Sequence, residues 1–170
     1  MNTFGKDDLE RTSAARLSAE DRVTLLEEQT ECTVVFAGAG AGGWPTGVVM
    51  SFMEVAGAFW LTSTDDRPQV RALASDPRMS IVVSNAGTTS WGRQMISYRG
   101  VGTVHRDRAT LEWFYPLWAQ RLAPASAEEF IRLLDSPKRV LVRFDPVAVQ
   151  ASHDSRRMPG DGRGGPRPSS

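Results

Sequence analysis

Three glycines with the spacing Gly38-x-Gly40-x-x-Gly43 are the first residues in this sequence whose pattern suggests chemistry. The spacing matches the fingerprint of dinucleotide-binding proteins, in which a helix begins at the glycines so that its free amides hold a pyrophosphate. Here Pro45 and Gly47 follow and oppose a helix. The next run, VVMSFMEV, is strand-like. Strand, glycines and strand therefore predict a hairpin with a flexible tip.

Other reactive side chains are few. Cys32 is the single cysteine and stands in a strand-like apolar run, so we expect it to be a packing residue. His105 and His153 are the two histidines, and no cysteine or carboxylate cluster surrounds either of them. The sequence therefore predicts no metal site. A Ser-His-Asp order, a paired-acid signature and a phosphate-binding loop are also absent from the sequence.

The composition is that of one ordinary globular domain. The 170 residues suffice for a single core, and 41% are hydrophobic. Lys and Arg together number 20, as do Asp and Glu, and a nucleic-acid surface usually needs a basic excess. No apolar run approaches the ~20 residues of a membrane span, and the N-terminus lacks the apolar region of a secretory signal. We expect a cytoplasmic protein with no nucleic-acid or membrane partner.

The elements needed to position any site follow a recognisable order. Helices are expected near 18–30 and near 67–75, and in DRATLEWFYPLWAQRL and SAEEFIRLLDSP, with Pro116 kinking or splitting the third. Six runs are strand-like: ECTVVFAG, VVMSFMEV, AFWLTST, RMSIVVSN, MISYRGVGTVH and KRVLVRFDPVAVQAS. The strand connections are mostly hairpin-like, which predicts a mainly β, α+β fold with an antiparallel sheet closed into a small barrel. Glycines 100 and 102 suggest a bulge or bend in the fifth strand.

The chain is expected to divide into three parts. Residues 1–16 are polar and predicted to be a flexible N-terminus. Residues 17–151 form the folded domain. Residues 152–170 are rich in Gly, Pro, Ser and Arg, cannot form a core, and are predicted to be a disordered tail.

From the third strand onward, the motifs resemble those of the pyridoxamine-phosphate-oxidase-like flavin-binding split barrels, and most closely their general-stress-protein branch. The motifs are the strand end Thr62-Ser63-Thr64, the short helix, the turn Asp76-Pro77-Arg78, the strand MSIVV, Gly100, Asp107 and Trp113. The resemblance covers about residues 18–150. It implies a six-stranded antiparallel split β-barrel, a homodimer, and one FMN in each of two grooves at the dimer interface.

The resemblance also assigns residues to the cofactor. Those implied to bind its phosphate combine hydroxyls, charge and a helix start: Ser63, Thr64, Arg67, Gln69 and Arg71. Those implied to contact its ring come from strands and one loop: Val49, Met50, Ser51, Thr62, Trp91 and Gln94. Trp91 is expected to stack on the ring, to lie in the interface or to cover the core, and Met95 competes with Gln94.

The sequence also departs from the family pattern. Pro68 and Gln69 stand where relatives carry Arg and Lys, and the strand GVVMSFM has no basic residue. These departures argue against vitamin-B6 oxidase activity. Arg67 can compensate, because a guanidinium grips phosphate in a bidentate fork.

The activity implied is that of an FMN-dependent oxidoreductase. A reduced nicotinamide would pass a hydride to flavin N5, and the electrons would go on to a small acceptor or to oxygen, so the protein needs no titrating catalytic side chain. Backbone amides or Gln94 would stabilise the anionic reduced ring. Two alternatives stay open. One is an F420-dependent reductase of the same fold, and the other is a non-catalytic flavin- or haem-binding sensor.

Overall fold

The computed structural model describes residues 15–38 and 43–158. Gly40 at the predicted hairpin tip, the N-terminal segment before residue 15 and the tail after residue 158 lie outside the described residues.

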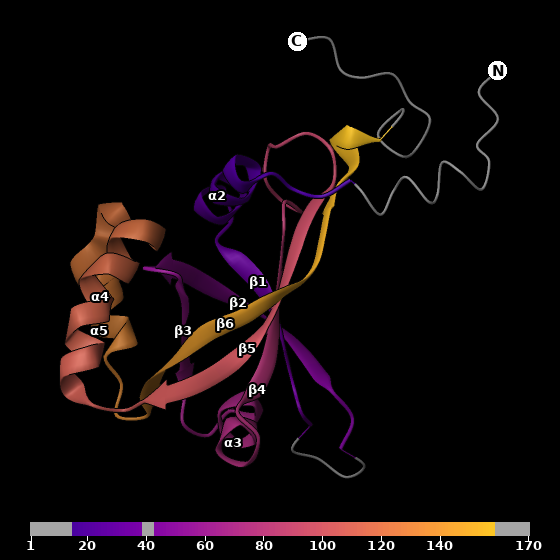
Figure 1. Ribbon diagram of the computed structural model, residues 1–170. Helices are drawn as coiled ribbons and strands as arrows, with labels where there is room; N and C mark the ends of the chain where they lie inside the picture. The colour runs from indigo at the N-terminus through magenta and orange to yellow at the C-terminus, as the bar shows by residue number, and fades with distance from the viewer. Residues whose placement is uncertain (1–14, 39–42, 159–170) are drawn as a thin grey trace, which may run out of the picture.

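Six antiparallel strands close into a barrel in the order β1-β2-β3-β6-β5-β4 (Figure 1). Their bounds are β1 (Glu31–Phe36), β2 (Thr46–Val55), β3 (Ala58–Thr64), β4 (Arg78–Ser84), β5 (Gln94–His105) and β6 (Arg139–Asp154). Closure leaves no free sheet edge within the barrel. The predicted six-stranded antiparallel barrel with flanking helices is confirmed.

The barrel interior is filled because its strands alternate apolar and less buried positions. Every second residue of β1 and β4 is buried, as expected of a half-buried strand. Strand β3 differs, because residues 58–61 are buried in succession. Phe59 and Leu61 point into the barrel core, while Ala58 and Trp60 join a second cluster on the other side of the strand.

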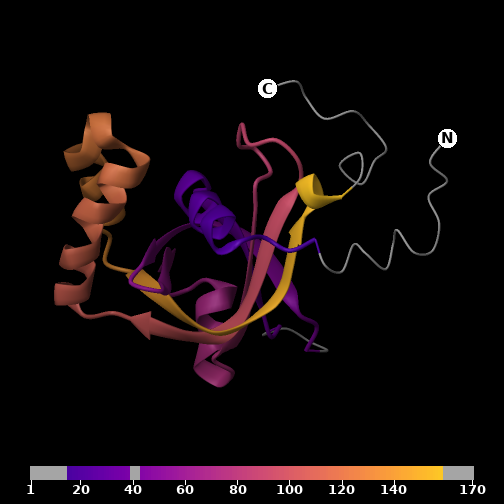
Figure 2. The same cartoon turned by 45° about the horizontal axis from the view of Figure 1, so that its top comes forward.

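Two helices cover the two ends of the barrel. Helix α2 (Ala19–Glu28) begins at Ser18, whose hydroxyl accepts the amide of Asp21, and it contributes Leu25 to the core. Helix α3 (Pro68–Ser75) contributes Val70 and Leu73 at the opposite end (Figures 1 and 2). The site predicted at the start of α3 therefore lies at the rim of the barrel.

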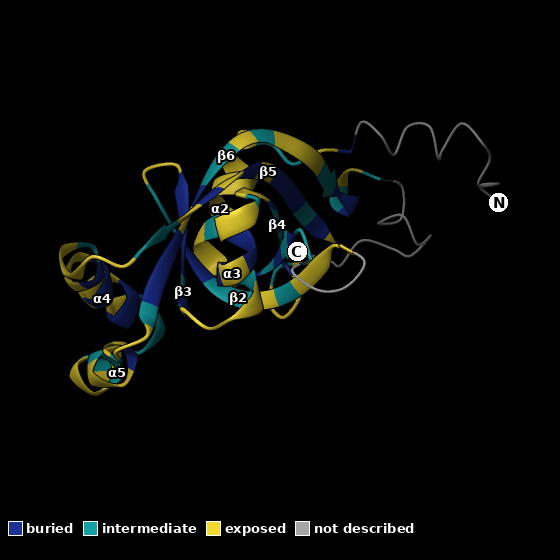
Figure 3. Ribbon diagram, turned by 90° about the horizontal axis from the view of Figure 1, so that it is seen from below, coloured by how far each residue is buried: buried dark blue, intermediate teal, exposed yellow. Residues whose placement is uncertain are grey.

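The other two helices form a pair on the outside of β3 (Figure 3). Helix α4 (Arg108–Leu122) is continuous through Pro116, so the helix is not split as one expectation had it. Helix α5 (Ala127–Leu134) packs on α4. Phe114 and Trp118 of α4 are fully buried in the second cluster with Trp60. This pair supplies a wall that the barrel alone lacks.

Strands β5 and β6 cross at very close range. Register shifts between Ser97 and Tyr98 and between Arg99 and Gly100 confirm the irregularity predicted near residue 100. A Cβ atom added at Gly100 would lie 2.2 Å from the backbone oxygen of Asp145. Glycine is therefore required here for space rather than for an unusual dihedral angle.

Both ends of the described chain are more ordered than the domain boundaries predicted. Strand β6 continues through Asp154, and a 3₁₀ turn, η3 (Ser155–Arg157), follows it. The backbone amide of Asp154 donates to the carbonyl of Ala15, and both residues are buried. The predicted disordered tail from residue 152 and the flexible segment up to residue 16 are thus corrected to exclude residues 152–157 and 15–16. No helix among the described residues is long and apolar enough to cross a membrane.

Candidate functional site

A groove of about 800 Å³ lies between the β2–β3 side of the barrel and the α4–α5 pair, with the start of α3 at one end. Its volume falls in the range typical of small-molecule sites. Eight of the eleven residues predicted to bind a cofactor line it: Val49, Met50, Ser51, Thr62, Ser63, Thr64, Arg67 and Gln69. The fold therefore brings together most of the predicted site from β2, β3 and α3.

Polar groups gather where β3 meets α3. Ser63 is buried, and its hydroxyl accepts a hydrogen bond of 3.3 Å from Nε2 of Gln69. The Gln69 amide also lies 3.7 Å from the sulfur of Met50. Gln69 thus spans from β3 to β2 at the barrel rim, and Ser63 keeps its own O–H to donate to a ligand.

Thr64 is committed to a neighbour. Its hydroxyl donates to the carboxylate of Asp66 at 2.7 Å, and Asp66 also pairs with Lys138 at 3.1 Å. The hydrogen bond from Thr64 and the pairing with Lys138 lower the pKa of Asp66 to about 2. The Thr64 hydroxyl can therefore accept a hydrogen bond from a ligand, but its one O–H is already used in the hydrogen bond to Asp66.

The start of α3 offers less than a full set of amides. Pro68 has no N–H, and the amides of Val70 and Arg71 donate to the carbonyl of Arg67. Among the described residues of this first turn, Gln69 is left as the one whose backbone N–H can donate to a ligand. An anion here would rely on side-chain charge rather than on the helix alone.

The charges around the groove end are unevenly paired. The two carboxylates beside it are neutralised, Asp65 by Arg106 at 2.6 Å and Asp66 by Lys138. Arg67 lines the groove, is exposed, and has no carboxylate within ion-pair distance in the described parts of the chain. This end of the groove therefore carries a net positive charge.

Arg139, the second groove arginine, was missed by the sequence reasoning. It begins β6 and pairs in register with Thr64 of β3, which places its side chain in the groove lining. The signal available in the sequence was the basic pair Lys138-Arg139 just before the last strand, but its proximity to Thr64 depends on the pairing of β3 with β6.

The rest of the groove is mainly apolar. The helix pair contributes Trp118, Leu122, Phe130 and Leu134, and β2 contributes Val48, Val49 and Met50 on the other side. Apolar walls with a few polar groups at one end are typical of small-molecule binding sites. Sequence reasoning had assigned Trp118 to packing, and it is buried as well as lining the groove.

Three predicted residues do not line the groove: Arg71, Trp91 and Gln94. Gln94 is buried at the start of β5, where its backbone amide donates to Oδ1 of Asn85. Trp91 belongs to the loop between β4 and β5 and is 38% exposed. Both lie at the far end of β4 from α3, and a seven-residue strand is roughly 20 Å long. Within one chain, these two residues are remote from the positively charged end of the groove.

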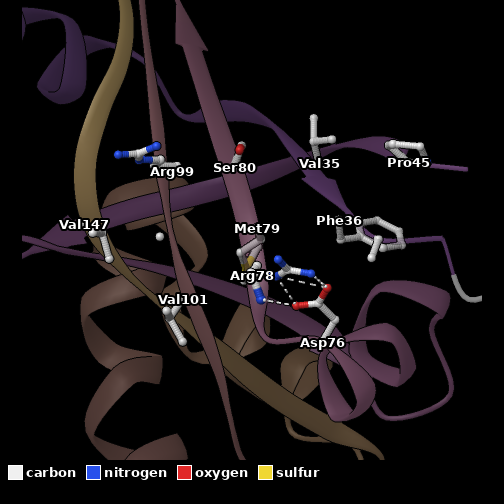
Figure 4. Close-up of a pocket in the computed structure, with 12 residues that line it drawn as sticks. Val35, Phe36, Pro45, Asp76, Arg78, Met79, Ser80, Arg99, Val101 and Val147 are labelled. Carbon is white, nitrogen blue, oxygen red and sulfur yellow. Dashed lines mark hydrogen bonds and ion pairs between the residues drawn. The ribbon is translucent and has the colours of Figure 1, made fainter. Parts of the chain in front are cut away.

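A second hollow, of about 460 Å³, lies on the outer surface of the barrel (Figure 4). Val35, Ser80, Arg99, Val101 and Val147 surround it, and we call these residues the outer face. The ion pair between Asp76 and Arg78 borders this face, with their closest atoms 2.6 Å apart. Ser80 and Arg99 add polar groups to walls that are otherwise mainly apolar.

The remaining reactive residues do not add a site. Cys32 is buried as predicted, and burial raises the pKa of its thiol to about 12, so it stays protonated. No cluster of three or more His, Cys, Asp or Glu that could hold a metal occurs within residues 15–38 and 43–158.

Comparison with known proteins decides the family. Residues 18–153 match the family described as pyridoxamine 5'-phosphate oxidase. The chain belongs to this family. A comparison with curated proteins finds no match.

Solved structures agree on the fold. A conserved hypothetical protein from Mycobacterium tuberculosis is 20% identical, with a TM-score of 0.70 over 92% of this chain and 94% of that one. HutZ, the haem storage protein from Vibrio cholerae, is 14% identical, with a TM-score of 0.63 over 80% and 93%. A protein described as an F420 reductase is 19% identical, with a TM-score of 0.55 over 75% and 94%. At these identities the likeness concerns the fold alone.

The residues of the groove fit a phosphorylated flavin, the cofactor that the resemblance implies. Arg67 and Arg139 have no carboxylate partner in the described chain, whereas both nearby carboxylates are paired, so an anion would complete the charge balance. Ser63 has a hydroxyl proton to give. The apolar walls beyond this end suit an aromatic ring system.

Proposed function

We propose that this protein is an FMN-dependent oxidoreductase that works in the cytoplasm as a homodimer. The observation that carries the proposal is the groove itself. It joins a positively charged end, formed by Arg67, Arg139 and Ser63, to apolar walls from β2 and the α4–α5 pair. The positive end would hold the phosphate, and Val49, Met50, Ser51 and Thr62 would contact the ring or its ribityl chain.

The cofactor, when bound, would supply hydride and electron transfer between a reduced nicotinamide and a small acceptor or oxygen. The residues of this chain would bind, orient and shield it. Trp118, Leu122 and Phe130 would exclude water from one side of the groove. No side chain in the lining needs to titrate for this role.

The homodimer is supported by what one chain leaves incomplete. Trp91 and Gln94 lie roughly a strand length from the phosphate end, so they could reach a flavin ring only in the groove of a second chain. Val101 and Val147 on the outer face are 39% and 70% exposed, and Val49, which also lines the groove, is 66% exposed. A second copy seated on this surface would bury these valines and close the groove.

The test is an absorbance spectrum of the purified protein between 300 and 600 nm, before and after addition of FMN, with the mass in solution measured on the same sample. Flavin bands that co-elute with a dimer and are bleached by a reduced nicotinamide are expected. Bands without bleaching would contradict the enzyme and favour a sensor. A monomer that binds FMN would contradict the role of the partner chain.

F420 is the main alternative cofactor. Its longer anionic tail would also use the positive end of the groove, and uptake of F420 in place of FMN would replace the first proposal. Haem fits less well, because the groove lining contains no His, Cys or Tyr, and Met50 is its single residue of a kind that ligates haem iron. A Soret band after addition of haem would contradict this ranking.

Within the family, we place the chain in the general-stress-protein-like branch. The support is the Thr62-Ser63-Thr64 strand end, which lines the groove, and the Asp76-Pro77-Arg78 turn, in which the Asp76 carboxylate accepts the Arg78 amide at 3.0 Å. The absence of basic residues from β2 argues against vitamin-B6 oxidase activity.

A further inference from the structure

Arg139 is held at the groove end by two backbone carbonyls. Its Nε donates to the carbonyl of Leu134, the last residue of α5, at 2.8 Å. One terminal nitrogen donates to the carbonyl of Ser63 at 3.4 Å. The guanidinium is therefore fixed between α5 and the β3 strand end before any ligand arrives.

These bonds use only part of its hydrogen-bonding capacity. A guanidinium has five N–H groups in a planar fork, and the two carbonyls take two of them. The side chain is only half-buried and lines the groove. The remaining N–H groups are thus available to an anion at the position where β3 ends.

Unlike the basic residues near it in the sequence, Arg139 has no ion-pair partner among the described residues. Lys138 pairs with Asp66 at 3.1 Å, and Arg143 on the same strand pairs with Asp145 at 2.7 Å. Arg139 has no carboxylate within ion-pair distance in the described residues, although it comes directly after Lys138. A structural arginine at the end of α5 would be satisfied by carbonyls alone, but an uncompensated cation in a groove favours an anionic ligand.

We propose that Arg139 is a second phosphate-binding residue, which lines the same groove as Arg67 and supplies the charge that Gln69 lacks. This inference rests on the proposed function, because it places the cofactor phosphate in the same groove. Bonds from β6 and α3 to one phosphate would bring together segments that are about 70 residues apart in the sequence. Its ligand chemistry is a phosphate monoester, with riboflavin as the matched ligand that lacks it.

The test compares Arg139→Gln and Arg139→Lys with the control Arg143→Gln, which removes the same charge from the same strand but away from the groove. Dissociation constants for FMN and riboflavin are measured by flavin fluorescence. Arg139→Gln should weaken FMN binding about 10- to 100-fold and leave riboflavin binding within about 2-fold. Arg139→Lys should fall between wild type and Arg139→Gln. Arg143→Gln should match wild type for both ligands.

Riboflavin separates a phosphate contact from a structural role. If Arg139→Gln weakens FMN and riboflavin equally, the residue acts through the position of α5 and the inference is wrong. If neither ligand is affected, Arg139 does not touch the cofactor, while the proposed function stands.

Inorganic phosphate keeps the inference testable when no flavin binds. If wild type binds neither FMN nor riboflavin, the proposed function fails by itself. The melting temperature with and without inorganic phosphate then tests whether Arg139 binds phosphate. A phosphate-dependent rise in the melting temperature of wild type and Arg143→Gln that is lost in Arg139→Gln supports the inference. Absence of that rise in wild type, or its survival in Arg139→Gln, overturns it.

Discussion

Replacing Asp154 with Asn tests the ordered C-terminal segment, which the sequence did not predict. The Asp154 side chain is 1% exposed and accepts three hydrogen bonds from Arg156: from the backbone amide at 3.0 Å, from Nε at 2.9 Å and from a terminal nitrogen at 2.8 Å. Arg156 also pairs with Asp21 of α2 at 2.5 Å. This cluster joins the end of β6 to the first described helix.

The expected cost follows from burial. Removing one partner of a buried ion pair costs about 3–5 kcal/mol because the other charge is left buried. Arg156 remains 31% exposed and keeps Asp21, so we take the lower end, about 3 kcal/mol. For a chain of this size, that corresponds to a fall in melting temperature of roughly 6–12 °C.

The control is Asp145→Asn on the same strand. Asp145 also pairs with an arginine two residues away, Arg143, but its side chain is 47% exposed. An exposed pair is worth about 0–1 kcal/mol, so the melting temperature should fall by less than about 4 °C. Thermal unfolding followed by circular dichroism measures both variants. Equal shifts would refute the argument that burial makes the Asp154 cluster stabilising.

A local measurement strengthens the assay. The amide of Ser155 donates to the carbonyl of Arg93, and the Arg93 amide donates to the hydroxyl of Ser155. The loop that carries Trp91 is thereby attached to the segment that Asp154 holds. Hydrogen exchange at the Arg93 amide should accelerate in Asp154→Asn and stay unchanged in Asp145→Asn.

Two further predictions concern stability. Gly100→Ala should cost about 1–3 kcal/mol, because the new Cβ would lie 2.2 Å from the Asp145 backbone oxygen, whereas Gly47→Ala meets nothing closer than 3.7 Å and should be neutral or slightly stabilising. Urea unfolding checks both, and an unchanged stability in Gly100→Ala would show that β6 can move away. The Ser18 hydroxyl and Arg156 lower the pKa of Asp21 to about 2, below its value near 4 in the unfolded chain. The stability contributed by this carboxylate is present above pH 4 and lost as the pH falls toward 2, so Asp21→Asn should flatten this part of the pH profile of unfolding free energy.

Local patterns predicted the elements well, because burial alternates along single strands and caps are local. Ser18 begins α2, Pro68 stands at the start of α3, and the six strand-like runs are the six strands. The tail boundary was misplaced because residues 152–157 are polar, and composition cannot show that Asp154 would be buried with an arginine partner. The continuity of α4 through Pro116 likewise depends on packing, since flanking Phe114 and Trp118 are buried against β3.

The candidate site likewise has one part that the sequence could predict and one part that depends on the tertiary structure. Ser63, Thr64, Arg67 and Gln69 lie within seven residues, so one strand end and one helix start bring them together, and the sequence alone could propose them. Arg139 lies 72 residues after Arg67 and reaches the groove only because β6 pairs with β3.

Sequence by itself determined the antiparallel, helix-flanked barrel and the local cluster at the start of α3, because period, turns and caps act between near neighbours. Tertiary structure decided which charges around that cluster stay unpaired, and that Trp118 and Phe130 form the opposite wall of the groove. It also decided that Trp91 and Gln94 lie at the far end of β4 and β5 from α3. These features depend on strand order and register, and pairing between distant strands brings together residues that no local pattern connects.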